Sequence, residues 1–175
     1  MRILSGKYKG TKIRTYAKRS YRPTLSKVRK SIFDILGPLS NCRVLDIFAG
    51  TGILGFESLS RGASSVLFVD NNSLINKILR ANTLLFSDCS ITIKKMNAIQ
   101  ILKTKQEFDL IFADPPYNYF SQHKRIDVDL FIDMILNKLK TKGRFVLECS
   151  NTVEIRYPVR TKLFGETQIC IGTKD

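Results

Sequence analysis

The stretch Val44-Leu-Asp-Ile-Phe-Ala-Gly-Thr-Gly-Ile-Leu-Gly55 predicts a buried strand that runs into a glycine-rich turn and then into a helix. Glycines in such a turn let a ligand approach the backbone closely, and the N–H groups at the helix start face that ligand. The spacing Gly50-x-Gly52-x-x-Gly55 also matches the dinucleotide fingerprint. A tight strand-to-helix turn in any doubly wound fold shows the same spacing, so the glycines alone leave a ligand site and a structural turn equally open.

The rest of the chain shows the same alternation of short apolar runs and helical segments. Continuous apolar runs are typical of parallel strands that are buried on both faces. Repeated strand-helix-strand units imply right-handed crossovers and an open twisted sheet with helices on both faces. We therefore predict an α/β fold with strands near 43–48, 65–70, 90–95, 108–113 and 144–148, helices near 52–61, 72–86, 97–103 and 127–140, and two further strands within 153–172, around Pro158 and Gly165.

Two acidic residues stand where predicted strands end: Asp46 before the glycines, and Asp70 twenty residues after Gly50. A carboxylate at the second position can accept both ribose hydroxyls of an adenosine group, which suits a nicotinamide cofactor and S-adenosylmethionine alike. Asp46 separates these ligands, because a carboxylate beside the turn would repel a pyrophosphate but can hold the ammonium of a methionyl group, directly or through water. The pair favours S-adenosylmethionine over a nicotinamide-dependent oxidoreductase.

A second motif, Asp114-Pro-Pro-Tyr117, ends the apolar run 108–113. Two consecutive prolines lack N–H groups and fix the backbone, so their carbonyls and the Asp114 side chain can point at one donor group. An exocyclic amine of a nucleic-acid base is such a donor, and Tyr117 offers a flat face on which an extruded base can stack. The structural alternative is a proline-rich turn capped by Asp114. Because the motif coincides with the cofactor signature upstream, we interpret Asp114, Pro115, Pro116 and Tyr117 as catalytic residues.

Positive charge is concentrated near the amino terminus. The 175 residues include 29 basic and 15 acidic ones, a net charge of +14, yet residues 1–30 hold eleven basic residues and no acidic one. Residues 3–15 are predicted to form two strands around a turn at Gly6 to Gly10, so this arm is folded. A basic arm on a nearly neutral body is typical of a protein that binds RNA or DNA. We predict nucleic-acid contacts for Arg2, Lys7, Lys9, Lys12, Arg14 and Arg22.

The length predicts one domain, residues 1–175, with a core large enough to need no disulfide or metal. We divide it into a basic hairpin over 1–20, a linking helix over 21–37 that Gly37-Pro38 ends, and a Rossmann-like core over 43–175. No apolar stretch is long enough to cross a bilayer, and the amino terminus lacks the apolar region of a signal peptide. We therefore expect a cytoplasmic protein that does not bind membranes.

The spacing of the cysteines and the single histidine argues against metal or histidine-based hydrolytic chemistry. No Cys-x-x-Cys pair exists to hold zinc or to run redox chemistry, and most of the cysteines lie in apolar, strand-like surroundings. His123 lies in a polar stretch with no triad partner nearby. We expect no metal, and we expect reduced cysteines in the core at Cys42, Cys89, Cys149 and Cys170.

Together, these motifs resemble the class I S-adenosylmethionine-dependent methyltransferases that modify amino nitrogens, whose catalytic signature is [DNS]-P-P-[YFW]. The sequence is similar in particular to the bacterial RsmD family. The resemblance covers nearly the whole chain, densely up to Tyr117 and thinly after about residue 150. Its further segments are Met1-Arg-Ile-Leu-Ser-Gly-Lys-Tyr-Lys-Gly10, Arg22-Pro-Thr24 with Val28-Arg29, Phe33-Asp-Ile-Leu36, Asp46-Ile-Phe-Ala-Gly-Thr-Gly52 and Ser60-Arg-Gly-Ala63.

The resemblance implies a mostly parallel, seven-stranded sheet with an antiparallel C-terminal strand, preceded by the basic β-hairpin. It also implies methylation of N2 of one guanine in small-subunit ribosomal RNA, within the small subunit or an assembly intermediate. We expect a monomer. The cofactor-binding residues that it implies are Asp46, Phe48, Gly50, Gly52, Asp70, Asn71, Asn97 and Ala98.

Asn97 departs from the family pattern. An Asp-Ala pair usually follows the third strand and takes the adenine amino group of the cofactor, whereas this chain has Asn97-Ala98. An asparagine oxygen can still accept that hydrogen bond, with weaker cofactor affinity as a consequence.

Two alternatives share these motifs. A DNA adenine N6-methyltransferase uses the same cofactor and signature, but 175 residues leave no room for a separate target-recognition domain. A non-catalytic RNA-binding module of ribosome assembly could retain the fold, although the intact glycines, Asp70 and the Asp114 motif argue against lost activity.

Overall fold

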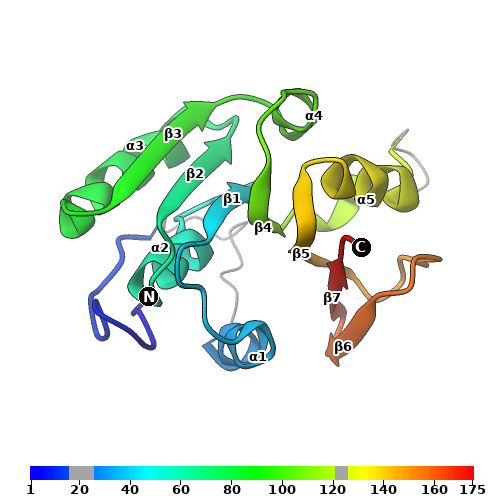
Figure 1. Cartoon of the computed structure of the whole chain (residues 1–175), viewed down its shortest axis with the longest axis horizontal. Helices are drawn as coiled ribbons and strands as arrows, with labels where there is room; N and C mark the ends of the chain where they lie inside the picture. Colours follow the sequence, from blue (N-terminus) through cyan, green and yellow to red (C-terminus); the bar gives the residue numbers. More distant parts are fainter. Residues whose placement is uncertain (16–25, 121–125) are drawn as a thin grey trace.

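The protein is built around one central β-sheet. The computed structural model describes residues 1–15, 26–120 and 126–175. Within these residues, seven strands are hydrogen-bonded in the order β3-β2-β1-β4-β5-β7-β6 and fan across the molecule (Figure 1). All neighbours pair in parallel except β7, which runs antiparallel to both β5 and β6. The predicted sheet is confirmed. Its strands are β1 (Arg43–Ile47), β2 (Ser65–Asp70), β3 (Ser90–Lys95), β4 (Phe108–Ala113), β5 (Leu139–Ser150), β6 (Arg160–Phe164) and β7 (Thr167–Thr173).

Helices cover both faces of the sheet and bury two apolar clusters. One cluster joins α1, α2 and α3 to one face, and the other joins α4 and α5 to the opposite face. Nearly every side chain of the central strands is buried, which explains their continuous apolar runs. The helices are α1 (Ser26–Leu36), α2 (Ile53–Ser60), α3 (Ser73–Thr83), α4 (Ala98–Leu102) and α5 (Val128–Leu136), with single turns η1 (Leu84–Phe86) and η2 (Tyr117–Phe120).

The carboxyl ends of the central strands meet at one edge of the sheet. Ile47 of β1 pairs with Val69 of β2 and with Ala113 of β4, and Ala113 pairs in turn with Leu147 of β5. The strand order reverses at β1, since the chain proceeds outward to β2 on one side and later returns to β4 on the other. Open α/β sheets bind their ligands in the crevice at such a switch point.

The predicted helix over 127–140 is too long. Helix α5 ends at Leu136, and Leu139 already pairs with Phe108 as the first residue of β5. The apolar residues Leu136 and Leu139 continue the helical spacing, which is why the pattern predicted a longer helix. The strand near 144–148 is correspondingly longer than predicted, and its register shifts where Lys142 adopts a φ of 62°.

The amino-terminal arm, residues 1–15, turns back on itself with less regular structure than the predicted hairpin. Arg2 and Lys12 form a single antiparallel bridge in place of two strands. Ile3 and Ile13 turn inward and are almost fully buried in the core. The fold of the arm therefore depends on its docking to the domain more than on pairing within it.

Helix α2 holds this arm through a buried carboxylate. Glu57 is fully buried, and its two oxygens accept hydrogen bonds from the N–H groups of Leu4 (2.7 Å) and Ser5 (3.1 Å). Gly6 lies so close to the same helix that an added Cβ would fall 1.7 Å from the carbonyl oxygen of Ser60. The local sequence around Glu57 and Ser60 gives no sign of these contacts with the arm.

Candidate active site

A cavity of about 600 Å³ opens at the carboxyl edge of the sheet, where β1, β2, β4 and β5 end. It brings together most of the residues predicted to bind cofactor and all four of those predicted to be catalytic. The predicted residues that line it are Asp46, Phe48, Gly50, Asp70, Asn71, Asp114, Pro115, Pro116 and Tyr117.

The turn between β1 and α2 has left-handed backbone at two of its glycines, as glycine permits, and also at Phe48, where a bulky residue rarely adopts it. Phe48, Gly50 and Gly52 all adopt positive φ, at 58°, 54° and 79°. A Cβ on Gly52 would lie 2.6 Å from the ring of Phe56 and 2.7 Å from Leu79, so a larger residue would displace both side chains. The turn thus exposes backbone at the cavity wall, at Phe48, Ala49 and Gly50, where a small ligand can approach closely.

Asp70 braces this turn from the end of β2. Its Oδ2 accepts a hydrogen bond from the Gly50 N–H at 3.1 Å, and its Oδ1 accepts one from the Asn72 N–H at 2.8 Å. Partial burial raises the pKa of Asp70 despite these two backbone donors. Asn72 then caps α3 by accepting bonds from the N–H groups of Leu74 and Ile75. These two hydrogen bonds therefore hold the Asp70 carboxylate at the cavity wall.

Asp46 is almost completely buried beneath the turn. Its Oδ2 accepts a hydrogen bond from the Gly55 N–H at 3.0 Å, near the start of α2. Burial raises the pKa of Asp46 to about 8. The hydrogen bond from Gly55 lowers this pKa in part, and the negative charge of the neighbouring Asp70 raises it by a smaller amount. A cationic group placed beside Asp46 would favour its ionised form.

We expect this raised pKa to make stability depend on pH. Between an unfolded pKa of about 4 and the folded pKa of about 8, the folded state holds a proton that the unfolded state has lost. The Asp46 contribution therefore falls as pH rises, by at most about 1.4 kcal/mol per pH unit. Urea unfolding of wild type and Asp46→Asn would be measured at pH 5, 6.5 and 8. The free energy of unfolding of the variant should rise relative to that of wild type as the pH increases. A constant difference would contradict the buried, protonated Asp46.

The Asp-Pro-Pro-Tyr motif forms the opposite wall of the cavity. It begins where β4 ends, and the Asp114 N–H approaches the carbonyl of Ile47 in β1 at 3.5 Å. The hydroxyl of Tyr117 is hydrogen-bonded to the hydroxyl of Thr167 in β7, while 41% of the Tyr117 side chain remains exposed. Thr167 thus anchors the rim aromatic to the sheet and leaves part of its surface open to solvent.

Glu148 is a cavity residue that the sequence analysis missed. It lies near the end of β5, beside the Asp114 motif, and lines the same cavity. Its position directly after a buried apolar strand segment is the signal that also singled out Asp46, Asp70 and Asp114. The predicted strand 144–148 ended at Glu148, but no motif follows this residue in the sequence to mark it as part of a site.

Asn97 and Ala98 lie at the start of α4 and are not among the residues that line the cavity. Asn97 is the N-cap of α4. Its side-chain oxygen accepts a hydrogen bond from the Ile99 N–H at 2.8 Å, and the side-chain oxygen of Gln100 accepts one from the backbone N–H of Asn97 at 3.0 Å. The asparagine oxygen thus already serves as a helix cap. Contact between Asn97 and a cofactor remains a prediction.

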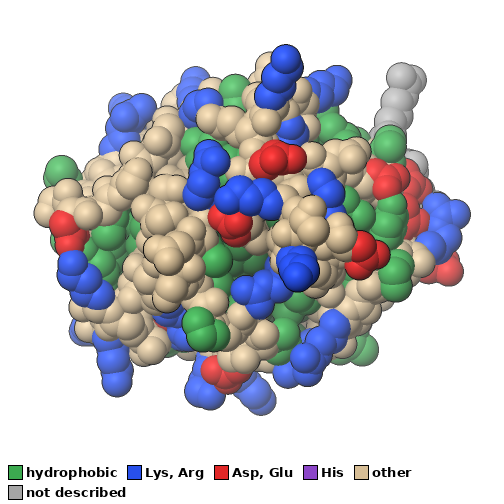
Figure 2. Space-filling view, viewed as in Figure 1, with side chains coloured by type: hydrophobic (Ala, Val, Ile, Leu, Met, Phe, Trp, Pro, Cys, Tyr) green, Lys and Arg blue, Asp and Glu red, His purple; other side chains and the backbone are tan. Residues whose placement is uncertain are grey.

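The basic residues of the arm are exposed, but some of their side chains already have partners within the protein. The Lys7 ammonium forms an ion pair with Asp88, which raises the pKa of Lys7, and the Arg2 guanidinium donates to the carbonyl of Gly10 at 2.9 Å. Figure 2 shows further lysines and arginines spread over the visible face, so positive surface extends beyond the arm. Lys9, Lys12 and Arg14 are exposed as well, and Arg22 lies outside the described residues.

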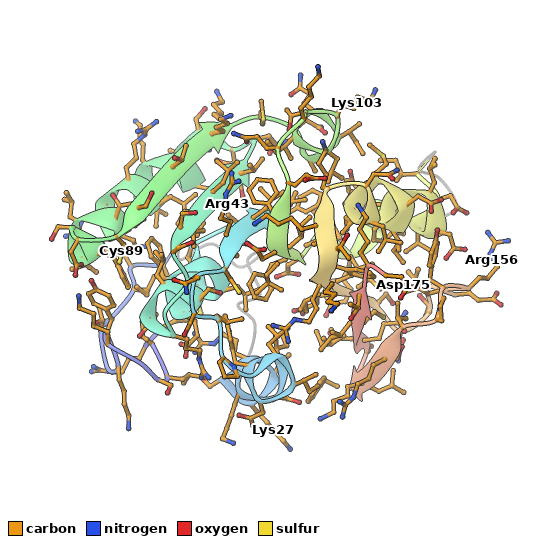
Figure 3. The ribbon with its side chains drawn as sticks, viewed as in Figure 1. Lys27, Arg43, Cys89, Lys103, Arg156 and Asp175 are labelled. Carbon is orange, nitrogen blue, oxygen red and sulfur yellow. The ribbon has the colours of Figure 1, made fainter. Side chains whose placement is uncertain are left out.

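The remaining predictions concern metals, thiols and membranes. In the described part of the chain, no cluster of three or more His, Cys, Asp or Glu residues has the arrangement of a metal site, and no helix is long and apolar enough to span a membrane. All four cysteines carry free thiols, with Cys149 and Cys170 buried. Cys89 lies on the side of the molecule where the arm packs (Figure 3), and its sulfur is 3.4 Å from the Tyr8 hydroxyl. His123 lies outside the described residues.

The strand order, the glycine turn and the cavity at the switch point define a Rossmann-like, class I methyltransferase fold. The structure of "Putative methyltransferase yhhF" from Escherichia coli superposes with a TM-score of 0.83 at 25% identity, covering 100% of this chain and 98% of that one.

The sequence pattern of the family described as "Conserved hypothetical protein 95" matches residues 1–171. The chain therefore belongs to this family, which is the RsmD family that its motifs resemble. "Putative rRNA methyltransferase YlbH" from Bacillus subtilis is 33% identical over 99% of both chains. "Ribosomal RNA small subunit methyltransferase D" from Haemophilus influenzae is 34% identical over 68% of this chain and 65% of its own length.

Proposed function

We propose that this protein transfers a methyl group from S-adenosylmethionine to the exocyclic N2 of a guanine in small-subunit ribosomal RNA. The observation that carries the proposal is the convergence of Asp46, Asp70 and the Asp114-Pro-Pro-Tyr117 motif on one cavity. The relatives named as ribosomal RNA methyltransferases support the substrate class. The protein would act as a single domain and a monomer in the cytoplasm, on the small subunit or an assembly intermediate.

The cavity residues suit S-adenosylmethionine. Asp70 would accept the ribose hydroxyls, and the exposed backbone from Phe48 to Gly50 would let the adenosine lie close to the turn. Asp46 would hold the ammonium of the methionyl group, directly or through water. Burial raises the pKa of Asp46, and a cation beside the carboxyl group would favour its ionised form. When bound, S-adenosylmethionine supplies a methyl group already activated by its sulfonium, so the protein must supply position and electrostatics.

The Asp114 motif would activate the guanine amine. The N2 lone pair is delocalised into the ring, which makes this nitrogen a poor nucleophile. Asp114 and the carbonyl of Pro115 would accept the two amine hydrogens and favour the pyramidal nitrogen that attacks, while Tyr117 would stack on the base. These contacts strengthen as charge develops on the nitrogen, which is the condition for catalysis. The amine proton would leave to Asp114 or to water.

A comparison of substrates tests the proposal against a DNA adenine methyltransferase. Purified protein would be incubated with methyl-labelled S-adenosylmethionine and either small ribosomal subunits from cells lacking this enzyme or duplex DNA of mixed sequence. We expect label in the ribosomal RNA alone. Label in DNA would contradict the RNA substrate but would still show methyl transfer. Cofactor binding without label in either nucleic acid would favour a non-catalytic binding module.

The arm should make RNA affinity sensitive to salt. Each lysine that contacts a phosphate adds roughly 0.7 to 0.9 to the slope of log affinity against log salt concentration. We expect the double variant Lys9→Ala, Lys12→Ala to lower that slope by about 1.5, and Lys7→Ala to lower it less, because Asp88 already neutralises Lys7. Affinities measured at several salt concentrations would test this.

The matched control for the arm is the double variant Lys103→Ala, Lys105→Ala. Both lysines are exposed, and Lys103 lies by α4, on the opposite side of the view from the arm (Figure 3). If the slope of log affinity against log salt concentration changed in this control but not in the arm variants, the RNA would bind at a surface other than the arm.

A further inference from the structure

Glu148 lies beside Asp114 in the cavity wall. Ala113 of β4 and Leu147 of β5 are paired in register, so the residue after each, Asp114 and Glu148, follows at the same level of the sheet. Neighbouring strands lie about 4.8 Å apart. Both residues line the cavity. The cavity wall therefore presents two adjacent carboxylates, of which the catalytic proposal uses one.

The backbone of Glu148 is rigidly placed. Strand β5 lies between β4 and β7, and Glu148 is paired with Ile169 of β7. Its neighbours Leu147 and Cys149 are buried, while Glu148 itself is half-buried. A carboxylate on an interior strand is held more precisely than one on a loop. This precision suits a residue that recognises a ligand by a hydrogen bond to one particular atom.

Two adjacent carboxylates match the edge of guanine and oppose that of adenine. Guanine carries N1–H and the N2 amine next to each other, both donors, whereas adenine carries an acceptor at N1. An ionised carboxylate can only accept hydrogen bonds. A base whose N1 is an acceptor would leave a carboxylate facing a lone pair, and sites built to bond a substrate N–H reject such analogues strongly.

We propose that Glu148 accepts the N1–H of the target guanine while Asp114 accepts from N2, so that Glu148 selects guanine over adenine. This inference rests on the proposed function. It makes Glu148 a specificity residue, and Asp114 with Pro115 remains responsible for activating the amine. The proposal also supplies a physical reason why an Asp-Pro-Pro-Tyr motif shared with DNA adenine methyltransferases would act here on guanine.

The test uses small subunits reconstituted with RNA in which 2-aminopurine replaces the target guanine. This base keeps the 2-amine but has no hydrogen on N1. The measured quantity is the ratio of kcat/KM for guanine to that for 2-aminopurine. We expect Glu148→Gln to lower the ratio roughly tenfold to a hundredfold, because glutamine can donate to an unprotonated N1 as well as accept from N1–H. Glu107→Gln, an exposed position before β4, is the matched control and should leave the ratio unchanged.

The outcomes separate this inference from the function on which it rests. Wild-type protein that methylates no guanine would overturn the proposed function. Wild-type protein that methylates guanine, with a ratio that Glu148→Gln leaves intact, would overturn only the role of Glu148. A loss of S-adenosylmethionine affinity in Glu148→Gln, measured by calorimetry, would also overturn it by assigning Glu148 to the cofactor. Should that variant fail to fold, Glu148→Asp keeps the acceptor on a shorter stem, and its expected result is a lower kcat with the guanine preference retained.

Discussion

Asp114→Ala is expected to lower kcat for methyl transfer by about a thousandfold, with S-adenosylmethionine affinity unchanged within a factor of about three. The variant removes the side chain that would accept the amine hydrogens, but it leaves β4 and the backbone of the two prolines in place. A contact that strengthens only as the amine attacks affects kcat more than binding. Single-turnover transfer to small ribosomal subunits measures the rate, and calorimetric titration measures cofactor affinity.

The matched control is Asp34→Ala, an exposed carboxylate on α1 that pairs with Lys30. It should retain the wild-type rate, because a surface ion pair of this kind contributes little to stability and lies outside the cavity. Near-normal turnover in Asp114→Ala, with cofactor still bound, would contradict the activation of the amine by this motif.

Glu57→Ala is expected to lower the free energy of unfolding by about 2 to 4 kcal/mol and to release the arm. The substitution leaves the N–H groups of Leu4 and Ser5 without their acceptor and removes the partner of Arg61, whose Nε donates to Glu57 at 2.8 Å. Urea unfolding measures the loss of stability. Faster proteolysis within residues 1–15 and weaker RNA binding would report the release of the arm.

Gly6→Ala should release the arm by a different route, since its added Cβ would fall 1.7 Å from the Ser60 carbonyl. Glu107→Ala, at an exposed position, serves as the matched control and should change stability by less than about 0.5 kcal/mol. Suppose that Glu57→Ala also changed the free energy of unfolding by less than about 0.5 kcal/mol and that the arm remained protected from protease. The buried Glu57 carboxylate would then not be what holds the arm.

The order of the elements was largely predictable from local pattern. The buried parallel strands β1, β2 and β4 are each a short apolar run with a helical segment after it, and the sheet confirms these strands. The cavity edge was predictable for the same reason, because Asp46, Asp70 and Asp114 all stand where such runs end. Parallel strands then bring these ends together, although the residues lie far apart in the sequence.

Features that depend on contacts between distant segments were not predictable in this way. The role of Glu57 arises from N–H groups 52 and 53 residues earlier in the chain, and nothing in helix α2 itself signals it. The arm has one bridge instead of two strands because buried Ile3 and Ile13 dock it to the core. Asn97, which the family resemblance implied as a cofactor contact, caps α4 in this structure, and the resemblance gave no sign of that structural role.

The central claim is tested most directly by the identity of the methylated nucleoside. Small ribosomal subunits from cells lacking this enzyme would be methylated with labelled S-adenosylmethionine, the RNA digested to nucleosides, and the products separated and identified by mass. We predict that the label appears in N2-methylguanosine and that Asp114→Ala slows its appearance about a thousandfold. Label in another nucleoside, such as N6-methyladenosine, would contradict guanine N2 as the target, and absence of label with the cofactor demonstrably bound would contradict methyl transfer to this RNA.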